Sequence, residues 1–335
     1  MRYVLEGSVR RSGNQIRANA QLIDAVSDVH LWAERFNGDT SDLFVVQDEI
    51  TSRIAIALSL ELLGTEAARP AEKPDALDYI LRGRATRLRP NSREVYEEAI
   101  SLFEHALALD PGSAEAKSLL AISLAGRVID LMTDSAITDL QRAKELGEQA
   151  LAALPRSPLA HFVKGQVLRA QRRYAEAIPE YETVLASDRN LASAYFALGQ
   201  CKLFTGSIDE TIPLTEHAIR LSPRDSQLGV WYQQIGWVHL LQSRSLEAAT
   251  WLEKARNHTP ALSIIRSLLA SAYALNGETE RAAVELAEAQ TLCPDDRFSN
   301  LARLRASRYW GVPKIRALYE ATYLAGLRLA GMPEE

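Results

Sequence analysis

The histidines and cysteines of this chain are the side chains that could bind a metal ion or act as a nucleophile. A metal site on a helix needs a second ligand at helical spacing, and no histidine has a second histidine or cysteine there. The six histidines are His30, His105, His161, His217, His239 and His258. Cys201 and Cys293 lie far apart in helical patterns, so we interpret them as reduced, small apolar residues of a cytoplasmic protein. We therefore expect no metal site and no cysteine chemistry.

Glycine-rich loops and nucleophile motifs are also absent from the sequence. No two of the 17 glycines lie two residues apart, which excludes a G-x-G-x-x-G loop for a nucleotide. The sequence also has no P-loop and no G-x-S-x-G motif. We therefore predict a non-catalytic chain, with no catalytic residues and no cofactor.

The arginines between residues 82 and 93 could bind phosphate if they shared one face of a helix. They are Arg82, Arg84, Arg87, Arg89 and Arg93. Arg84 and Arg87 fall on one side of a helix, whereas Arg82 and Arg89 point nearly opposite, so we interpret the cluster as solvated arginines. The net charge of -5 gives no support for nucleic-acid or anionic-membrane binding. The longest apolar stretch, IAIALSLELL, is too short to span a membrane, so we predict neither kind of partner.

A repeat near 34 residues organises most of the chain. Gly165, Gly199, Gly236 and Ala270 follow one another at intervals of 34, 37 and 34 residues. The helix-ending prolines Pro223, Pro260 and Pro294 keep the same step. This period is typical of the tetratricopeptide repeat, in which each unit is a pair of antiparallel helices. We predict about six repeats over residues 77–294, followed by C-terminal capping helices over residues 295–335 that cover the last open face.

Small residues mark the places where the paired helices would cross. The expected facing pairs are Gly165 with Ala177, Gly236 with Ala248, and Ala270 with Ala282. Larger residues four positions on, such as Tyr181 and Leu252, would fill the space between repeats. Thr211 and Thr215 depart from this pattern, so we expect a looser repeat there. The interval from Pro111 to Pro155 is about ten residues longer than one repeat, which predicts longer helices or a longer loop.

The first 64 residues have a different pattern. YVLEGSV, QIRANAQLID and DVHLWAERF read as strands, and Ser12-Gly13-Asn14 forms a turn between the first two. Apolar residues four apart then predict one helix, and residues 65–76 form a proline-containing linker. One helix on three strands buries little surface and leaves a sheet edge bare. The predicted fold class is therefore mainly α: a tetratricopeptide helical solenoid preceded by a small, truncated α/β domain.

RYVLEGSVRRSGNQIRANAQLIDAVSDVHLWAERF, with LFVVQDEI behind it, resembles the TolB-like domain of multidomain bacterial signalling proteins. In those proteins the domain lies between an N-terminal effector and tetratricopeptide repeats. The effector is often a class III adenylate or guanylate cyclase and sometimes a winged-helix domain. The ending LRLAGMPEE also resembles the C-terminus of the cyclase-linked family. The resemblance implies that Met1 is an internal start or the remnant of a truncated gene, and that the bare sheet edge supports self-association.

The resemblance to tetratricopeptide repeats also implies a concave groove, lined by the first helix of each pair, that binds a peptide or protein partner. The groove positions map to Phe162, Gln166, Arg169, Phe196, Gln200, Gln233 and Trp237. This mixture suits a partly apolar peptide held by amide hydrogen bonds. The alternative, that Phe196 and Trp237 only pack between helices, stays open. Three functions follow: an interaction scaffold, the regulatory region of a nucleotide cyclase, and part of a winged-helix transcription regulator.

Overall fold

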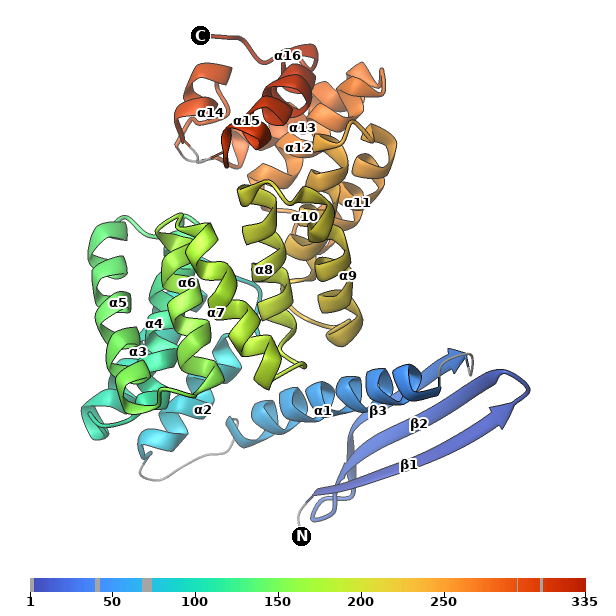
Figure 1. Ribbon diagram of the computed structural model, residues 1–335, viewed down its shortest axis with the longest axis vertical. Helices are drawn as coiled ribbons and strands as arrows, with labels where there is room; N and C mark the ends of the chain where they lie inside the picture. Colours follow the sequence, from blue (N-terminus) through green and yellow to red (C-terminus); the bar gives the residue numbers. More distant parts are fainter. Residues whose placement is uncertain (1–2, 40–42, 68–73, 294, 308–309) are drawn as a thin grey trace.

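The computed structural model describes residues 3–39, 43–67, 74–293, 295–307 and 310–335. A three-stranded antiparallel sheet at the N-terminus is followed by a long curved array of helices (Figure 1). The predicted fold class, a mainly helical solenoid behind a small sheet segment, is confirmed.

The sheet has the order β1-β2-β3, with β1 at Tyr3–Ser12, β2 at Gln15–Asp24 and β3 at Val29–Asp39. Gly13 makes the first turn with a φ of 58°, a conformation that suits glycine. Helix α1 (Leu43–Ala67) covers one face of β2 and β3, where Leu22 and Phe36 pack against Ile54 and Leu58. Strand β1 lies beyond this cover.

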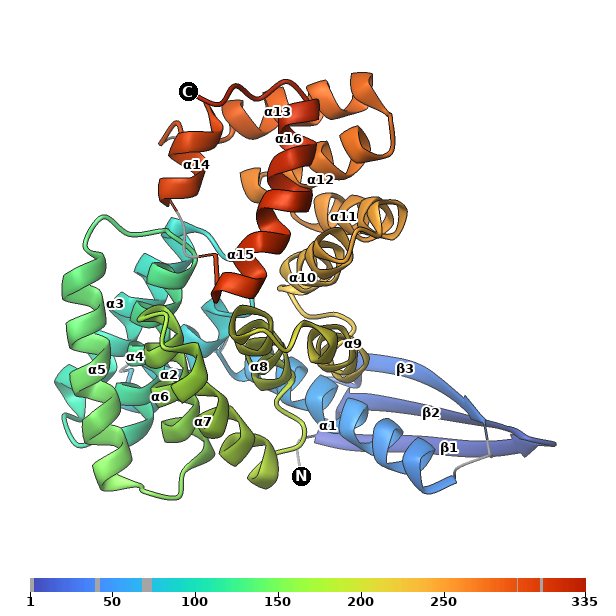
Figure 2. The ribbon, with the colours of Figure 1, turned by 45° about the horizontal axis from the view of Figure 1, so that its top comes forward.

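Six antiparallel helix pairs form the array in the described part of the chain (Figures 1 and 2). The pairs are α2 (Ala76–Thr86) with α3 (Arg93–Leu109), α4 (Ala114–Ile129) with α5 (Ala136–Ala153), α6 (Pro158–Ala170) with α7 (Tyr174–Ser187), α8 (Ala192–Thr205) with α9 (Thr211–Leu221), α10 (Leu228–Leu241) with α11 (Ser245–His258), and α12 (Ser263–Leu275) with α13 (Thr279–Thr291). Local sequence begins several of these helices. Ser92, Ser113 and Ser157 each accept a hydrogen bond from a backbone N–H in the first turn.

The extra length of the second pair is divided between its helices and its loop. Helices α4 and α5 have 16 and 18 residues, whereas α6 and α7 have 13 and 14. The connection from Asp130 to Ser135 is also longer than the one from Gln171 to Arg173. Pro294, which carries the last step of the period, lies outside the described residues.

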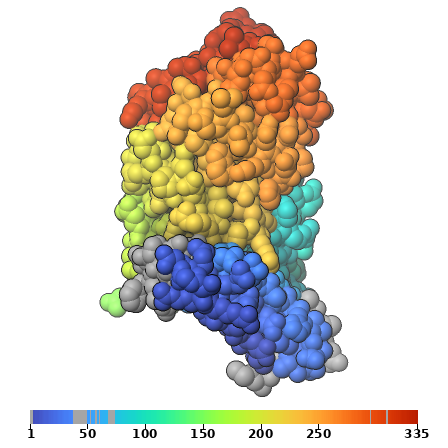
Figure 3. Space-filling model, turned by 90° about the vertical axis from the view of Figure 1, so that its right-hand side faces the viewer, coloured from blue at the N-terminus to red at the C-terminus, as the bar shows by residue number. Residues whose placement is uncertain are grey.

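The sheet segment lies against the fourth and fifth pairs of the array. Figure 3 shows the N-terminal segment (blue) below the yellow helices. Ile56 of α1 packs with Ala192, Leu228 and their apolar neighbours. Glu34 of β3 also lies 3.8 Å from Arg224, in the loop between α9 and α10. The linker expected at 65–76 is shorter in the structure, because α1 continues to Ala67; residues 68–73 lie outside the described ones.

Close helix crossings depend on glycine. A Cβ atom added to Gly165 would lie 2.8 Å from Cε1 of Tyr181, and one added to Gly236 would lie 2.7 Å from Cγ of Leu252. Both distances are too short for two carbon atoms, so any larger side chain must separate the helices.

We predict that Gly236→Leu destabilises the protein by about 1–3 kcal/mol, because leucine overpacks the crossing of α10 with α11. Urea unfolding measures the loss. The matched control is Gly64→Leu, since a Cβ atom at Gly64 meets nothing within 4 Å. Equal unfolding midpoints for the two variants would contradict the crossing geometry.

The looser packing expected at Thr211 and Thr215 is not found, because both threonines are fully buried. The Thr211 hydroxyl donates to the Gly199 carbonyl at 3.1 Å, and the Thr215 hydroxyl donates to the Thr211 carbonyl at 2.8 Å. Gln234 Nε2 also donates to Thr215 Oγ1 at 2.8 Å. The hydroxyls therefore find acceptors inside the helix crossing, which makes threonine a suitable small residue there.

The C-terminal helices do more than cover the open end of the array. After α14 (Leu301–Ser307), one continuous helix consists of α15 (Pro313–Tyr319), a π-helical turn (η3, Glu320–Leu324) and α16 (Ala325–Leu329). This helix runs back along the first helices of the last three pairs: α16 packs on α12, and α15 reaches α8 (Figure 2). Buried residues four apart hold it there, namely Ile315, Tyr319, Tyr323 and Leu327. The chain thus fills part of its own concave side.

Candidate partner-binding cavity

A large hollow, here called the concave cavity, lies on the inner side of the array. Its volume is about 1280 Å³. The first helices of the pairs, α4, α6, α8 and α10, form its walls, together with the α2–α3 and α9–α10 loops. Residues of β3, α1 and the segment after α13 complete the lining.

All seven residues that the sequence assigned to the groove line the concave cavity. Only Gln166 and Gln200 are partly exposed; the other five are buried. They are Phe162, Arg169, Phe196, Gln233 and Trp237. The structure therefore brings the seven residues together, while their role in binding stays a prediction.

The aromatic residues of this set are held by other rings. The Phe162 ring lies edge-on to Tyr181 with centroids 5.8 Å apart, and the Phe196 ring stacks on Trp231 at 6.0 Å. Trp237 contacts Tyr319 of the C-terminal helix at 5.4 Å. Phe196 and Trp237 thus pack between helices, as the alternative interpretation proposed, and they also form part of the cavity wall.

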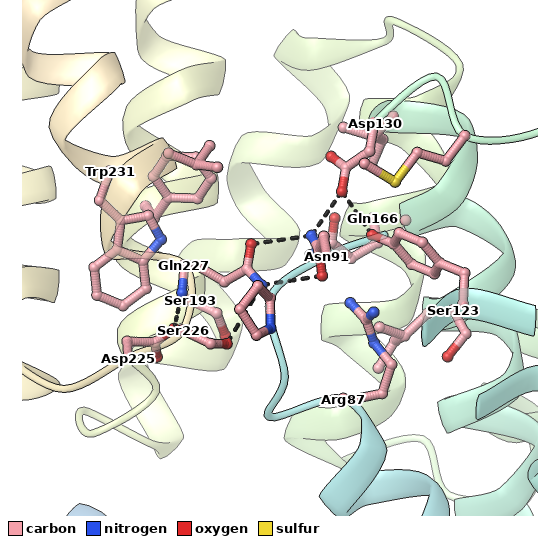
Figure 4. Close-up of a pocket in the computed structure, with 18 of the residues that line it drawn as sticks. Arg87, Asn91, Ser123, Asp130, Gln166, Ser193, Asp225, Ser226, Gln227 and Trp231 are labelled. Carbon is pink, nitrogen blue, oxygen red and sulfur yellow. Dashed lines mark hydrogen bonds between the residues drawn. The ribbon is translucent and has the colours of Figure 1, made fainter. Parts of the chain in front are cut away.

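A polar network crosses the cavity and joins distant pairs (Figure 4). The amides of Asn91 and Gln227 donate to each other at 3.0 Å, although the two residues are 136 positions apart. Asn91 also donates to Asp130 Oδ2 at 2.6 Å, and the Tyr96 hydroxyl donates to the same oxygen at 2.7 Å. Burial and the Asp130 carboxylate raise the pKa of Tyr96 well above its usual value. The network ties the first, second and fifth pairs together, and no local sequence signal marks it.

The arginine cluster is divided by the structure. Arg84, Arg89 and Arg93 are exposed and pair with Glu115, Glu98 and Asp134 respectively. The interpretation as solvated arginines fits these three residues. It does not fit Arg87, whose guanidinium stacks 4.1 Å from the centre of the Tyr96 ring and lines the concave cavity.

Cys201 and Cys293 are free, buried thiols. Burial raises the pKa of the Cys201 thiol to about 12, with nearby Arg169 acting in the opposite direction. Burial and the hydrogen bond to Asp295 also raise the pKa of Cys293. In the described part of the chain, no group of three or more histidines, cysteines or acids is placed to hold a metal ion. None of the described helices combines the length and the apolar character that crossing a membrane requires.

We predict that neither thiol reacts with a disulfide reagent at neutral pH while the protein is folded, because thiolate is scarce and access is blocked. Absorbance at the wavelength of the released thiol measures the reaction. Both thiols should react once urea unfolds the chain. Rapid stoichiometric labelling of the folded protein would contradict the burial of these residues.

Comparison with known proteins supports the repeat assignment. Two overlapping segments, residues 136–192 and 165–223, match the family model of the tetratricopeptide repeat. The chain contains tetratricopeptide repeats. Such folds are typically non-enzymatic and serve as protein-interaction scaffolds.

Relatives and solved structures agree with this fold. The chain is 36% identical over 181 residues to Putative adenylate cyclase 3 of Rhizobium meliloti (strain 1021). That match covers 53% of this chain but only 31% of the relative, so the chain spans less than a third of that protein. The structure of the APC/C hetero-tetramer Cut9-Hcn1 is similar with a TM-score of 0.57 and 13% identity, covering 76% of this chain and 46% of that one. A monomeric IFIT1 mutant with Gppp-AAAA gives a TM-score of 0.57 and 16% identity, covering 79% and 61%.

Proposed function

We propose that this chain is a non-catalytic scaffold whose tetratricopeptide array binds a peptide segment of a protein partner in the concave cavity. The observation that supports it most is the cavity itself, about 1280 Å³ in volume and lined by the first helices of successive pairs. This volume exceeds the roughly 300–1,000 Å³ of ordinary small-molecule pockets, so a longer ligand suits it better. The proposed contacts are the seven residues assigned from the sequence.

The partner segment would occupy the part of the cavity between α4, α6 and α8. The chain's own C-terminal helix covers the inner side of α10 and α12, where Tyr319 meets Trp237. Gln166 of α6 and Gln200 of α8 are partly exposed, so their amides are available for hydrogen bonds to a peptide backbone.

Selection from a phage-displayed library of random peptides tests this function. Selected peptides are then titrated by fluorescence polarisation against Gln200→Trp, which would fill the cavity, and against Gln149→Trp on an exposed position of α5. We expect Gln200→Trp to weaken binding about tenfold or more and Gln149→Trp to leave it unchanged. A selection without binders, or binders that ignore Gln200→Trp, would contradict the proposal.

A second candidate is the regulatory region of an adenylate or guanylate cyclase. The identity of 36% with Putative adenylate cyclase 3 over 181 residues favours it. In this arrangement residues 1–64 would be part of a TolB-like domain and the array would receive or transmit a signal to a catalytic domain. The reading frame upstream of Met1 tests the idea: a cyclase domain there supports it, whereas an unrelated gene or a winged-helix domain counts against it. Cyclic nucleotide formed by the purified chain would contradict the non-catalytic role.

Self-association through β1 is a further proposed property of the scaffold. Strand β1 pairs only with β2 among the described strands, and Leu5 and Val9 on its surface are 50% and 72% exposed. An apolar edge strand of this kind is a template for pairing with another copy.

We therefore expect the chain to associate with rising concentration in analytical ultracentrifugation. Val9→Lys should reduce the association, because a lysine disfavours edge pairing. Val284→Lys is the matched control, since Val284 on α13 is also exposed. A wild-type chain that stays monomeric at all concentrations would contradict this property.

A further inference from the structure

We propose that the concave cavity selects acidic partner segments, by accepting a carboxylate of the peptide at Arg169. This inference rests on the proposed peptide-binding function and names the chemistry of its ligand. It concerns the part of the cavity between α4, α6 and α8, which the C-terminal helix leaves open.

Arg169 is a buried cation without an anionic partner. The residue is 8% exposed and lines the cavity. Its Nη1 donates to Gln166 Oε1 at 2.9 Å, whereas its Nε has no hydrogen-bond partner. Within the described residues no carboxylate forms an ion pair with it. Burying an unpaired charge is unfavourable, so a ligand that brings a carboxylate would satisfy an interaction that the protein leaves unmade.

The other unsatisfied groups of the cavity require the same chemistry. In the described part of the chain, the buried side-chain atoms that line the cavity without a hydrogen-bond partner are all N–H donors. They are Trp32 Nε1, Arg53 Nε, Arg87 Nη1, Arg169 Nε and Trp237 Nε1. Acceptors are what such a surface lacks, and a peptide supplies them as carboxylate and carbonyl oxygens.

The acids of the cavity do not neutralise this site. Asp134 pairs with Arg93 at 2.9 Å, and Asp295 pairs with Arg297. Glu34 likewise pairs with Arg53 at 2.7 Å.

Asp130 is the acid closest in effect to Arg169, but Tyr96 and Asn91 already donate to it. Burial disfavours the charge of Arg169, yet neighbouring groups that include Asp130 raise its pKa above the usual value for arginine. The guanidinium therefore stays charged and keeps a free donor towards the cavity.

The test uses matched pairs of labelled short peptides taken from the phage selection, each pair identical except that glutamate is replaced by glutamine. Each peptide is prepared with a free and with an amidated C-terminus, so that a side-chain carboxylate is distinguished from a terminal one. We expect one carboxylate source to strengthen binding about tenfold or more. Equal binding by all members of a set would overturn the inference and leave the peptide-binding function intact.

Gln166→Glu tests the role of Arg169 from the protein side. The new carboxylate would lie where Gln166 already accepts from Arg169 Nη1, so it would pair with the guanidinium and compete with the ligand. We expect the variant to fold, to melt no lower than the wild type, and to lose the preference for glutamate. Gln149→Glu adds the same charge at an exposed position of α5 and should keep the preference.

Arg169→Lys and Arg169→Gln complete the set, with melting temperatures measured to detect misfolding. Lysine should retain part of the preference and glutamine should abolish it. An unchanged preference in Gln166→Glu or in folded Arg169→Gln would overturn the assignment to Arg169. Displacement of the peptide by a single-stranded oligonucleotide, with no preference between glutamate and glutamine, would overturn the assignment of an acidic peptide.

Discussion

Gly326→Leu is expected to release the C-terminal helix from the array and to destabilise the protein by about 3 kcal/mol. A Cβ atom at Gly326 would lie 2.6 Å from the carbonyl oxygen and 2.9 Å from the Cα of Ser271, and this backbone cannot move aside as a flexible side chain would. Ser271 also donates to the Tyr323 carbonyl at 2.9 Å, and Ser267 shares a hydrogen bond with the Tyr323 hydroxyl at 2.7 Å. The leucine would break this close contact between α16 and α12.

Urea unfolding and hydrogen–deuterium exchange measure the effect. Residues 313–329 should lose protection first, while α2 to α7 keep theirs, because repeats contact mainly their neighbours. Gly64→Leu is again the control, since its position is open. Retained protection of residues 313–329 in Gly326→Leu would contradict the packing of this helix on α12.

Asp139→Ala is expected to destabilise the protein by about 3–5 kcal/mol, the usual range for breaking a buried ion pair. Asp139 is 3% exposed and accepts hydrogen bonds from Arg127 Nε at 2.7 Å, Arg127 Nη2 at 2.5 Å and Thr133 Oγ1 at 2.7 Å. These bonds hold the long loop between α4 and α5. Alanine would leave the Arg127 guanidinium, which is 19% exposed, without its partner.

A second aspartate–arginine pair nearby provides the control. Asp134 pairs with Arg93, but both side chains are well exposed, so Asp134→Ala should change the unfolding midpoint little. Both variants are compared by thermal and urea unfolding. Equal, small losses in the two variants would show that the Asp139 pair does not stabilise the second repeat.

The repeat array could be predicted because its signals are local and periodic. Gly165 and Gly236 are required wherever two helices cross closely, so their spacing reveals the pairs. The same spacing places residues on the concave side, which is why Gln166 and Gln200 line the cavity. Their exposure could not be predicted in this way, since it depends on which other helices reach the same surface.

The long-range contacts could not be predicted from one sequence. Asn91 and Gln227 meet only because the curvature of five helix pairs brings their loops together. The return of the C-terminal helix depends on the match of Gly326 with Ser271, and neither residue carries a recognisable signal alone. The threonines at 211 and 215 were misjudged because their hydroxyls find acceptors only in the folded helix crossing.

Hydrogen–deuterium exchange with a selected peptide bound tests the central claim most directly. If the concave cavity binds the peptide, protection should increase in α4, α6 and α8, and the amides of α5, α7 and α9 should change little. Increased protection confined to these second helices, or to the β1 edge, would contradict binding in the concave cavity.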